Sequence, residues 1–345
     1  MSVSQDDFIL QNIFDHKEFT MLTELQVRQL NNMNAAAQRA QLGTLLGILA
    51  PVGDVYYLDP ANGVDTNSGT APASAFKTME AAYDALTANQ NDVLVYIAGA
   101  TSLNLEEALV WSKSYTHLVG MCAPTRTAQR ARIFQKSTLT GASPLVTVSG
   151  SGCLFKDLYI FQGVNDATSL INVSVTGGRN SFERVHFAGG GHATMAIDGG
   201  ASLKLDAAEE NIFEDCTIGV DTVSAGTGLV GLLFDSEAHR NEFYNCKFRL
   251  YAGNAGAAWV EVSDSTGIDR DNEFVNCRFY NTSATSLTSG FVIPAGMGAP
   301  RRLYLKDCVS HGAAKWDAND RGVLFGNMNA VTGADLSGSL VEMIS

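Results

Sequence analysis

Five charged residues between positions 235 and 270 have the types and spacing that cleavage of a polysaccharide requires. Asp235 and Glu237 lie in one stretch, and Asp264 and Asp269 follow about thirty residues later. Glycoside hydrolysis uses two carboxyl groups roughly 5–10 Å apart, and a repeating fold could stack Asp235 and Asp264 at that range. A lyase instead needs a basic residue beside acidic groups, and Arg270 is the residue here that suits this role.

Other features of the sequence count against catalysis. The segments between the repeats described below are short, and we see none long enough to build a carbohydrate groove. Aromatic platforms for sugars are few, because the chain has three tryptophans and Trp259 alternates like a strand residue. We expect His186 and His192, in a glycine-rich turn, to be surface histidines. The five charged residues therefore remain the site of an alternative function, and the main expectation names no catalytic residue.

A repeated phrase organises the chain from residue 153 onward. It reads Asn-Ser-Phe-Glu-Arg-Val-His-Phe at 180–187 and returns at 211–218, 241–248 and 272–279, with looser copies at 153–160 and 303–310. The third positions are spaced 27, 31, 30, 31 and 31 residues apart. They are Phe155, Phe182, Phe213, Phe243, Phe274 and Leu305. A fixed period of this length indicates a repeat architecture.

Each copy has the composition of a β-strand, and no copy is followed by a helical pattern. A period of about 30 residues accommodates three short strands and three turns. The sequence therefore predicts an all-β fold, a right-handed parallel β-helix with about 30 residues per coil, preceded by an N-terminal α-helical segment. Equivalent residues of successive coils should then lie about 4.8 Å apart.

Stacking of the coils places equivalent residues in columns. Two positions before the phenylalanine is an amide column that suits a ladder of hydrogen bonds, formed by Asn180, Asn211, Asn241 and Asn272. Three positions after it is a column that should face the core, formed by Cys216, Cys246, Cys277 and Cys308. Because the phenylalanine and the cysteine have opposite parity, a bend must separate them.

A third column alternates in charge. Three positions before the phenylalanine stand Arg179, Glu210, Arg240, Asp271 and Arg302. Like charges stacked this closely would repel, so we interpret the column as a ladder of ion pairs at a corner of the coil. The alternative is a set of solvated corner residues that happen to alternate.

Composition excludes several functions. The chain of 345 residues has a net charge of −13, which argues against nucleic acid and against an anionic membrane surface. The longest apolar run, residues 42–52, is too short to cross a bilayer. Stacked cysteines have poor geometry for disulfides and diverge instead of converging on a metal. We expect six free thiols, assembly in a reducing cytoplasm, and no cofactor or metal.

The sequence divides into four regions. Residues 1–53 form an expected helical attachment or oligomerisation segment, 54–92 a strand, a turn loop and a capping helix, 93–312 the β-helix, and 313–345 a C-terminal cap. The attachment residues are Leu22, Leu25, Leu30, Met33, Leu45 and Leu46. The helical segment could pack on the β-helix as a cap, or it could associate with other copies or dock onto a larger particle.

The loop after the first strand of region 54–92 is rich in oxygen donors, which are Asp59, Asn62, Asp65 and Asn67. They alternate as calcium ligands do, but no glutamate closes the site at the usual spacing. A plain turn, followed by a helix that Thr78 caps, is the interpretation we adopt.

A family resemblance enters at this loop. The run Asp-Pro-x-Asn-Gly-x-Asp-x-Asn-x-Gly at 59–69, then Phe76-Lys-Thr and a short alanine-rich helix, resembles the leading segment of pectate-lyase-like parallel β-helix proteins. The Asn-x-Phe-x-Asn-Cys-x-Phe rungs resemble the same group, especially tailspikes, fibres and other virion proteins of tailed bacteriophages. The resemblance covers roughly residues 54–312. That superfamily contains polysaccharide lyases and hydrolases as well as non-catalytic virion proteins.

The resemblance implies a bacteriophage virion structural protein, located in the virion after assembly in the host bacterial cytoplasm. It would be a short tailspike, a fibre or a capsid decoration, and homotrimers are usual in such proteins. Its expected partners are other virion proteins of the capsid, portal or tail, with a host surface glycan as a further candidate. Two alternatives stay open: a polysaccharide-degrading tailspike enzyme on the same scaffold, and a free-standing carbohydrate-binding protein.

Overall fold

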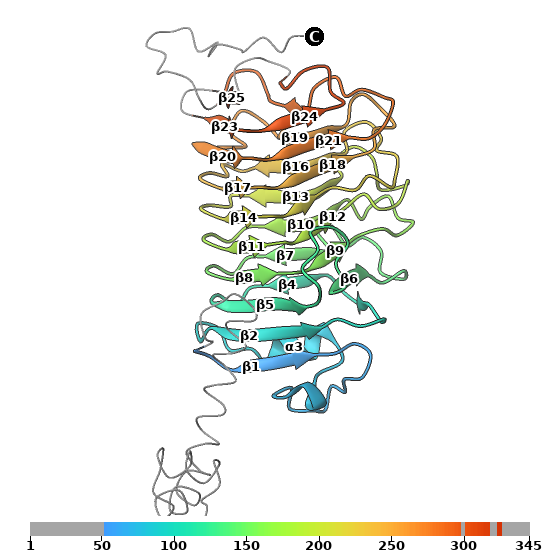
Figure 1. Cartoon of the computed structure of the whole chain (residues 1–345), viewed down its shortest axis with the longest axis vertical. Helices are drawn as coiled ribbons and strands as arrows, with labels where there is room; N and C mark the ends of the chain where they lie inside the picture. Colours follow the sequence, from blue (N-terminus) through green and yellow to red (C-terminus); the bar gives the residue numbers. More distant parts are fainter. Residues whose placement is uncertain (1–51, 298–300, 318–322, 326–345) are drawn as a thin grey trace, which may run out of the picture. The chain divides into compact units, whose positions relative to one another are not determined.

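The structure, a computed structural model, describes residues 52–297, 301–317 and 323–325. Within them the chain winds repeatedly through three sheets, and neighbouring strands of each sheet run parallel (Figure 1). We call one passage through the three sheets a coil. This is the predicted parallel β-helix, so the fold class is confirmed. The predicted helical attachment residues, from Leu22 to Leu46, lie outside the described residues.

Successive coils place their strands in a fixed spatial order. The first sheet contains β1 (Val55–Leu58), β2 (Asp92–Ile97), β5 (Thr116–Met121), β8 (Leu154–Lys156), β11 (Ser181–Glu183), β14 (Ile212–Glu214), β17 (Glu242–Tyr244), β20 (Asp271–Val275), β23 (Arg302–Lys306) and β25 (Val323–Phe325). The second contains β3 (Leu103–Leu105), β6 (Arg132–Gln135), β9 (Tyr159–Phe161), β12 (His186–Ala188), β15 (Thr217–Ile218), β18 (Lys247–Leu250), β21 (Arg278–Asn281) and β24 (Val309–His311). The third contains β4 (Leu109–Trp111), β7 (Val146–Val148), β10 (Ile171–Val175), β13 (Ala201–Asp206), β16 (Val230–Asp235), β19 (Ala258–Val262) and β22 (Phe291–Val292).

The register of the first sheet is the one that the repeat predicts. Phe182 pairs with Phe155 on one side and Phe213 on the other, and the series continues through Phe243 and Phe274. From Phe182 to Phe274 the centroids of successive rings are 4.7 Å apart and the rings are stacked nearly parallel. All these rings are buried, so the phenylalanine stack forms one continuous wall of the core.

A left-handed residue joins the first sheet to the second in each of six coils. Its φ lies between 51° and 56°. The six residues are Asp157, Arg184, Asp215, Asn245, Asn276 and Asp307. Aspartate and asparagine tolerate this conformation better than other side chains do. The bend lets the phenylalanine before it and the cysteine after it both face the interior, because it interrupts the strict alternation of an extended chain.

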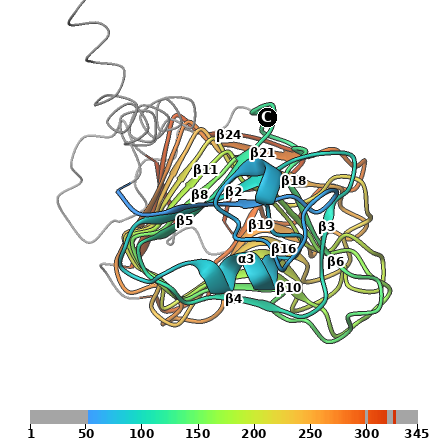
Figure 2. The ribbon, with the colours of Figure 1, turned by 90° about the horizontal axis from the view of Figure 1, so that it is seen from below.

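The first coil is closed by the segment that precedes it. The helix α3 (Met79–Ala85) begins after Thr78, whose hydroxyl accepts a hydrogen bond from the Ala81 backbone N–H. Met79 and Ala82 are buried in the same core as the strands, and Figure 2 shows α3 lying across this end of the coil. A 3-10 turn, Pro72–Ser74, precedes it. Helix α3 thereby covers apolar side chains that the first coil would otherwise leave exposed.

The acidic loop before α3 is engaged in turns. Asp59 accepts hydrogen bonds from the backbone N–H groups of Ala61 and Asn62, and Asp65 accepts two more from residues 77 and 78. Among the described residues, no group of three or more histidine, cysteine, aspartate or glutamate side chains could hold a metal ion. No helix in the described ranges is long and apolar enough to cross a membrane.

Two connections between the first and second sheets depart from the repeat. Two residues join these sheets in six coils, but residues 98–102 join β2 to β3 and residues 122–131 join β5 to β6. We call this ten-residue stretch the insertion loop. Its Arg126 carbonyl accepts a hydrogen bond from the hydroxyl of Thr217, which belongs to a strand three coils further along. The expectation of short segments applies between copies of the repeat, and the insertion loop lies before the first recognisable copy.

The phenylalanine stack should carry much of the stability. Phe213→Ala removes a ring with no exposed surface, and we expect a loss of about 3–5 kcal/mol in the free energy of unfolding. Its neighbour Ile212 is 41% exposed, so Ile212→Ala should cost no more than about 0.5 kcal/mol. Urea denaturation followed by circular dichroism measures both variants. Equal losses would contradict the stack as the main source of stability.

Candidate functional site

The predicted asparagine column forms a continuous buried ladder. The backbone N–H of Asn180 donates to the Asn211 side-chain oxygen at 3.0 Å. The side-chain amides of Asn211 and Asn241 donate to the next oxygen in the series, at 3.0 Å and 2.9 Å, ending at Asn272. Each amide also donates to a backbone carbonyl of the preceding coil. The ladder therefore satisfies polar groups inside the turn, and this role is structural.

The cysteine column faces the core beside it. Cys216, Cys246, Cys277 and Cys308 each place the sulfur 3.2–3.4 Å from a carbonyl oxygen of the preceding coil. All six cysteines are free thiols. Burial raises the pKa of the Cys246 thiol, which disfavours the reactive thiolate. These sulfurs fill space in the core.

The column of alternating charge forms ion pairs over three coils. Glu210 forms ion pairs with both neighbours: Nε of Arg179 lies 2.7 Å from one carboxylate oxygen, and Nη2 of Arg240 lies 2.7 Å from the other. Within the described part of the chain, no ion pair joins Arg240 to Asp271. Arg179, Glu210 and Arg240 are left-handed residues, whereas Asp271 belongs to strand β20. The side chain of Asp271 therefore leaves the backbone in a different direction from the side chains of those three residues. Arg302, the last member, is mostly buried in β23.

Asp235, the first catalytic candidate, is held as a hydrogen-bond acceptor. Lys204 lies 2.8 Å from one of its carboxylate oxygens and also binds Asp206 at 2.9 Å. The Ser263 hydroxyl donates to the other oxygen at 2.7 Å. Partial burial alone would raise the pKa of Asp235, but the Lys204 ammonium and the Ser263 hydroxyl outweigh it and lower that pKa. A carboxyl in this state is a poor proton donor.

Two other candidates, Glu237 and Asp264, lie close to Asp235 but do not form an acid–base pair with it. Thr266 donates to Asp264 from its hydroxyl and its backbone N–H, both at 2.7 Å, and these bonds lower the pKa of Asp264. The charge of Asp235 acts in the opposite direction, so the two carboxylates are neighbours. The backbone N–H of Glu237 binds the Thr266 carbonyl.

Two further candidates, Asp269 and Arg270, form an ion pair at 3.2 Å. An arginine held by the adjacent carboxylate keeps its charge, so it is a poor base for a lyase.

Glu261 is a carboxyl whose pKa is shifted in the opposite direction, and no sequence pattern selects it. Burial raises its pKa, and the negative charge of Asp198 raises it further. It lies in β19, and its neighbours in the adjacent coils are Leu233 and Val292. A protonated carboxyl could donate to a leaving group, but the flanking coils place no second carboxylate in its column.

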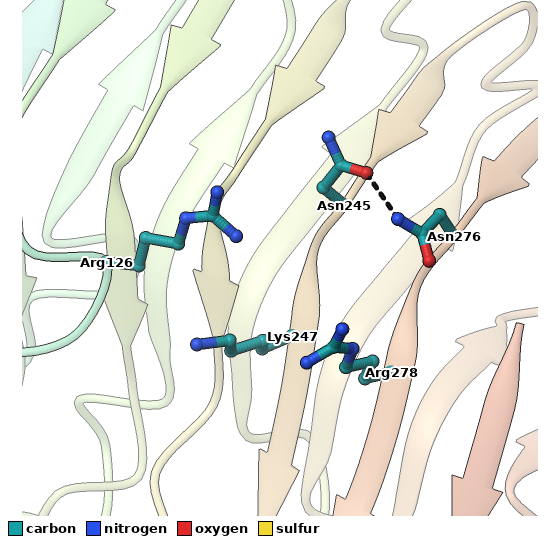
Figure 3. Close-up of a pocket in the computed structure, with 5 residues that line it drawn as sticks. All are labelled: Arg126, Asn245, Lys247, Asn276 and Arg278. Atoms are coloured by element: carbon teal, nitrogen blue, oxygen red, sulfur yellow. Dashed lines mark hydrogen bonds between the residues drawn. The ribbon is translucent and has the colours of Figure 1, made fainter.

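A basic pocket on the second sheet is the more complete site. It has a volume of about 220 Å³ and is lined by Arg126, Asn245, Lys247, Asn276 and Arg278. Figure 3 shows the three cationic side chains reaching into one gap, with the two amides beside it. The basic pocket thus combines three positive charges with hydrogen-bonding amides, which is the chemistry of an oxyanion site.

The insertion loop forms one wall of this pocket. The backbone N–H of Ala128 donates to Nδ1 of His186 at 3.0 Å, and Nε2 of His186 lies 2.9 Å from the Gly219 carbonyl oxygen. The ring is therefore neutral, with its proton on Nε2. Gln129 adds a hydrogen bond to the Arg184 carbonyl. His186 is only 5% exposed, so the prediction of a surface histidine is wrong: the insertion loop covers it.

The pocket carries a net positive charge, because one carboxylate, Asp215, lies beside three cations. Lys247 and Arg278 are direct neighbours on β18 and β21. Arg126 is paired with Asp215 at 2.8 Å. Neither Lys247 nor Arg278 has an ion-pair partner within the part of the chain that the structure describes. Burial lowers the pKa of Lys247, and the charges of Arg126, Arg249 and Arg278 lower it further.

The sequence contained a signal for this pocket. Lys247 and Arg278 both lie four positions after the phenylalanine of their repeat, where other copies have Tyr159, His186 and Thr217. Like charges in directly opposed positions destabilise a sheet, so two cations in one column mark a place where a bound anion would be favourable. The participation of Arg126 could not be inferred, because it belongs to no copy of the repeat.

Comparison with known proteins supports the fold and does not identify a family. No protein-family model matches the chain, and no curated protein sequence matches it. Among solved structures, a rhamnogalacturonan lyase is similar with a TM-score of 0.55 and 16% identity, over 79% of this chain and 73% of that one. A pectin methylesterase in complex with a hexasaccharide has a TM-score of 0.51 and 18% identity, over 74% and 81%.

A protein of Geobacillus virus E2, ORF18, is also similar, with a TM-score of 0.31 and 13% identity over 86% of this chain and 62% of that one. That score is too low to carry an argument. The chain is therefore a parallel β-helix protein with a fold similar to this rhamnogalacturonan lyase and this pectin methylesterase, and at these identities the likeness shows the fold alone.

The asparagine ladder should be sensitive to truncation. Asn241→Ala removes the oxygen that accepts both the backbone and the side-chain N–H of Asn211, at 3.1 Å and 3.0 Å. Leaving these buried donors unpaired should cost about 1–3 kcal/mol of unfolding free energy. The exposed Asn104 provides a control, since Asn104→Ala should change stability by less than about 0.5 kcal/mol. Chemical denaturation of both variants decides the matter.

His186 should make stability depend on pH. Burial lowers its pKa from 6.5 to about 4 in the folded state, so only the unfolded chain takes up a proton between these values. The contribution is fully present above about pH 6.5 and is lost as the pH falls towards 4, by up to about 3 kcal/mol. His186→Gln removes the titration and leaves the carboxylates unchanged. Parallel stability curves for wild type and variant between pH 7.5 and pH 4.5 would rule out this assignment.

Proposed function

We propose that this protein is a non-catalytic structural component of a tailed bacteriophage virion. Residues 1–53 attach it to the particle, and the β-helix projects as a rigid shaft. The observation that carries the proposal is the unbroken register of the first sheet from β8 to β23, with a two-residue corner between the first and second sheets in every coil of that range. Such regular stacking suits a part that bears load and holds its length.

The state of the predicted catalytic carboxylates supports a non-catalytic role. Asp235 and Asp264 both have lowered pKa values and accept hydrogen bonds from neighbouring groups. General acid catalysis at neutral pH needs a carboxyl with a raised pKa opposite a second, ionised one. Neither of these residues supplies the first member of that pair.

The assembly we propose is a homotrimer whose partners are capsid, portal or tail proteins. Its support comes from the sequence: an apolar N-terminal segment that needs a partner, and the resemblance of residues 54–312 to virion β-helix proteins. In this proposal the protein resides in the virion, and the shaft is available for contact with a host surface glycan.

A polysaccharide-degrading enzyme is the second candidate, and one observation favours it. The pKa of Glu261 is raised by burial and by Asp198, as a general acid requires. The solved structures of similar fold include a rhamnogalacturonan lyase and a pectin methylesterase in complex with a hexasaccharide, so this architecture accommodates such chemistry. The enzyme would use Glu261 as the proton donor, with Asp198 as its partner.

The two candidates predict different results with purified protein. We expect no reducing ends and no unsaturated product from a broad panel of neutral and acidic polysaccharides. If product does form, and Glu261→Gln abolishes it while Asp235→Asn and Asp264→Asn do not, the enzyme is established with Glu261 as its acid. Loss of product in Asp235→Asn or Asp264→Asn would instead restore the residues selected from the sequence.

Truncation separates attachment from free carbohydrate binding. By light scattering after size exclusion, we expect the full chain to have the mass of three chains and the chain that begins at Gly53 to have the mass of one. A full chain that is monomeric, and a truncated chain that still binds glycan, would support a free-standing carbohydrate-binding protein instead.

A further inference from the structure

We propose that the basic pocket binds the carboxylate of an acidic sugar. The ligand class follows from the lining side chains: Arg126, Lys247 and Arg278 supply the charge, and Asn245 and Asn276 supply hydrogen bonds to the ring. The site lies on the second sheet, whereas Asp235 and Glu261 belong to the third. It does not rest on the proposed virion role, because it would serve an enzyme or a free binding protein equally well.

The charge arrangement is the first argument. Lys247 and Arg278 stand directly opposite each other on parallel strands, where like charges destabilise a sheet. A column that served stability would alternate in charge, as Arg179, Glu210 and Arg240 do at the other corner of the first sheet. An anion in the gap would reduce the repulsion between Lys247 and Arg278, since Asp215 is the carboxylate near Lys247 and it is already paired with Arg126.

The insertion loop provides the second argument. Its backbone and its Gln129 side chain are fixed to the second sheet through hydrogen bonds that do not involve the Arg126 side chain. The loop nevertheless brings Arg126 into a region that already contains Lys247 and Arg278, with Asp215 as its only ion-pair partner among the described residues. An arginine held at such a place can present its planar fork to a carboxylate in two parallel hydrogen bonds.

The amides and the volume define the rest of the ligand. Asn276 donates to the Asn245 oxygen at 2.8 Å, which fixes both side chains. The free N–H of Asn245 and the free oxygen of Asn276 then remain for hydroxyl groups, and neither has another partner among the described residues. A pocket of about 220 Å³ is larger than a bare oxyanion needs, on the scale of about 30 Å³ for one water molecule. One sugar ring with its carboxylate fits better.

The electrostatics limit the length of the ligand. The chain has a net charge of −13, so a long polyanion would be repelled by most of the surface. A polymer with isolated acidic units could place one carboxylate in the pocket and keep neutral units elsewhere.

Binding of defined small probes to the full chain tests the proposal. We would measure sodium glucuronate, glucose and sodium sulfate by isothermal titration calorimetry at low ionic strength. We expect glucuronate to bind at least ten times more tightly than glucose or sulfate. The double variant Lys247→Met/Arg278→Met should weaken glucuronate binding at least tenfold, whereas the exposed Lys77→Met, which removes a charge far from the pocket, should leave it unchanged.

Each other outcome overturns a stated part of the idea. Equal binding of glucose and glucuronate would exclude the carboxylate as the recognised group. Sulfate that binds as tightly as glucuronate would show a plain oxyanion site with no role for the sugar ring. Glucuronate binding that survives in the double variant would place the ligand elsewhere. Thermal unfolding of the variants excludes misfolding, and a native mass that is monomeric would contradict the virion assembly without affecting this test.

Discussion

The structure depends on one backbone constraint, the left-handed residue between the first and second sheets of each coil. Without it, an extended chain would send the phenylalanine and the cysteine of the same repeat to opposite faces. With it, Phe243 and Cys246 both enter the core, and the chain turns with only two connecting residues. The stacked rings, the asparagine ladder and the register of the sheets all follow from this corner being the same in successive coils.

The sequence predicted the fold because the period carries the register. Equivalent residues such as Phe213 and Phe243 are 30 positions apart, and no knowledge of distant contacts was needed to pair them. It failed at the insertion loop for the opposite reason. The bond between Thr217 and Arg126 spans 91 residues and follows no period, so the burial of His186 could not be read from its neighbours.

The candidate sites divide in the same way. The spacing places Asp235 and Asp264 in successive coils, but the pairing of Asp235 with Lys204 depends on which face each strand presents. Lys247 and Arg278 could have been selected as opposed like charges, whereas Arg126 and the burial of Glu261 required coordinates. The sequence therefore predicted the coil to which each residue belongs. The coordinates were needed to show which outward-facing side chains already have ion-pair or hydrogen-bond partners.

The insertion loop spans several coils along the stack. It leaves the first sheet at β5 and places Arg126 beside Asp215, three coils further on, with Lys247 in the coil after that. Coils elsewhere could be gained or lost in evolution as whole units, each changing the length of the stack by about 4.8 Å. Between β8 and β17 the number of coils is fixed, because one more or one fewer would carry the lysine out of the arginine's reach. The contacts of the insertion loop thus constrain the number of coils that the loop spans.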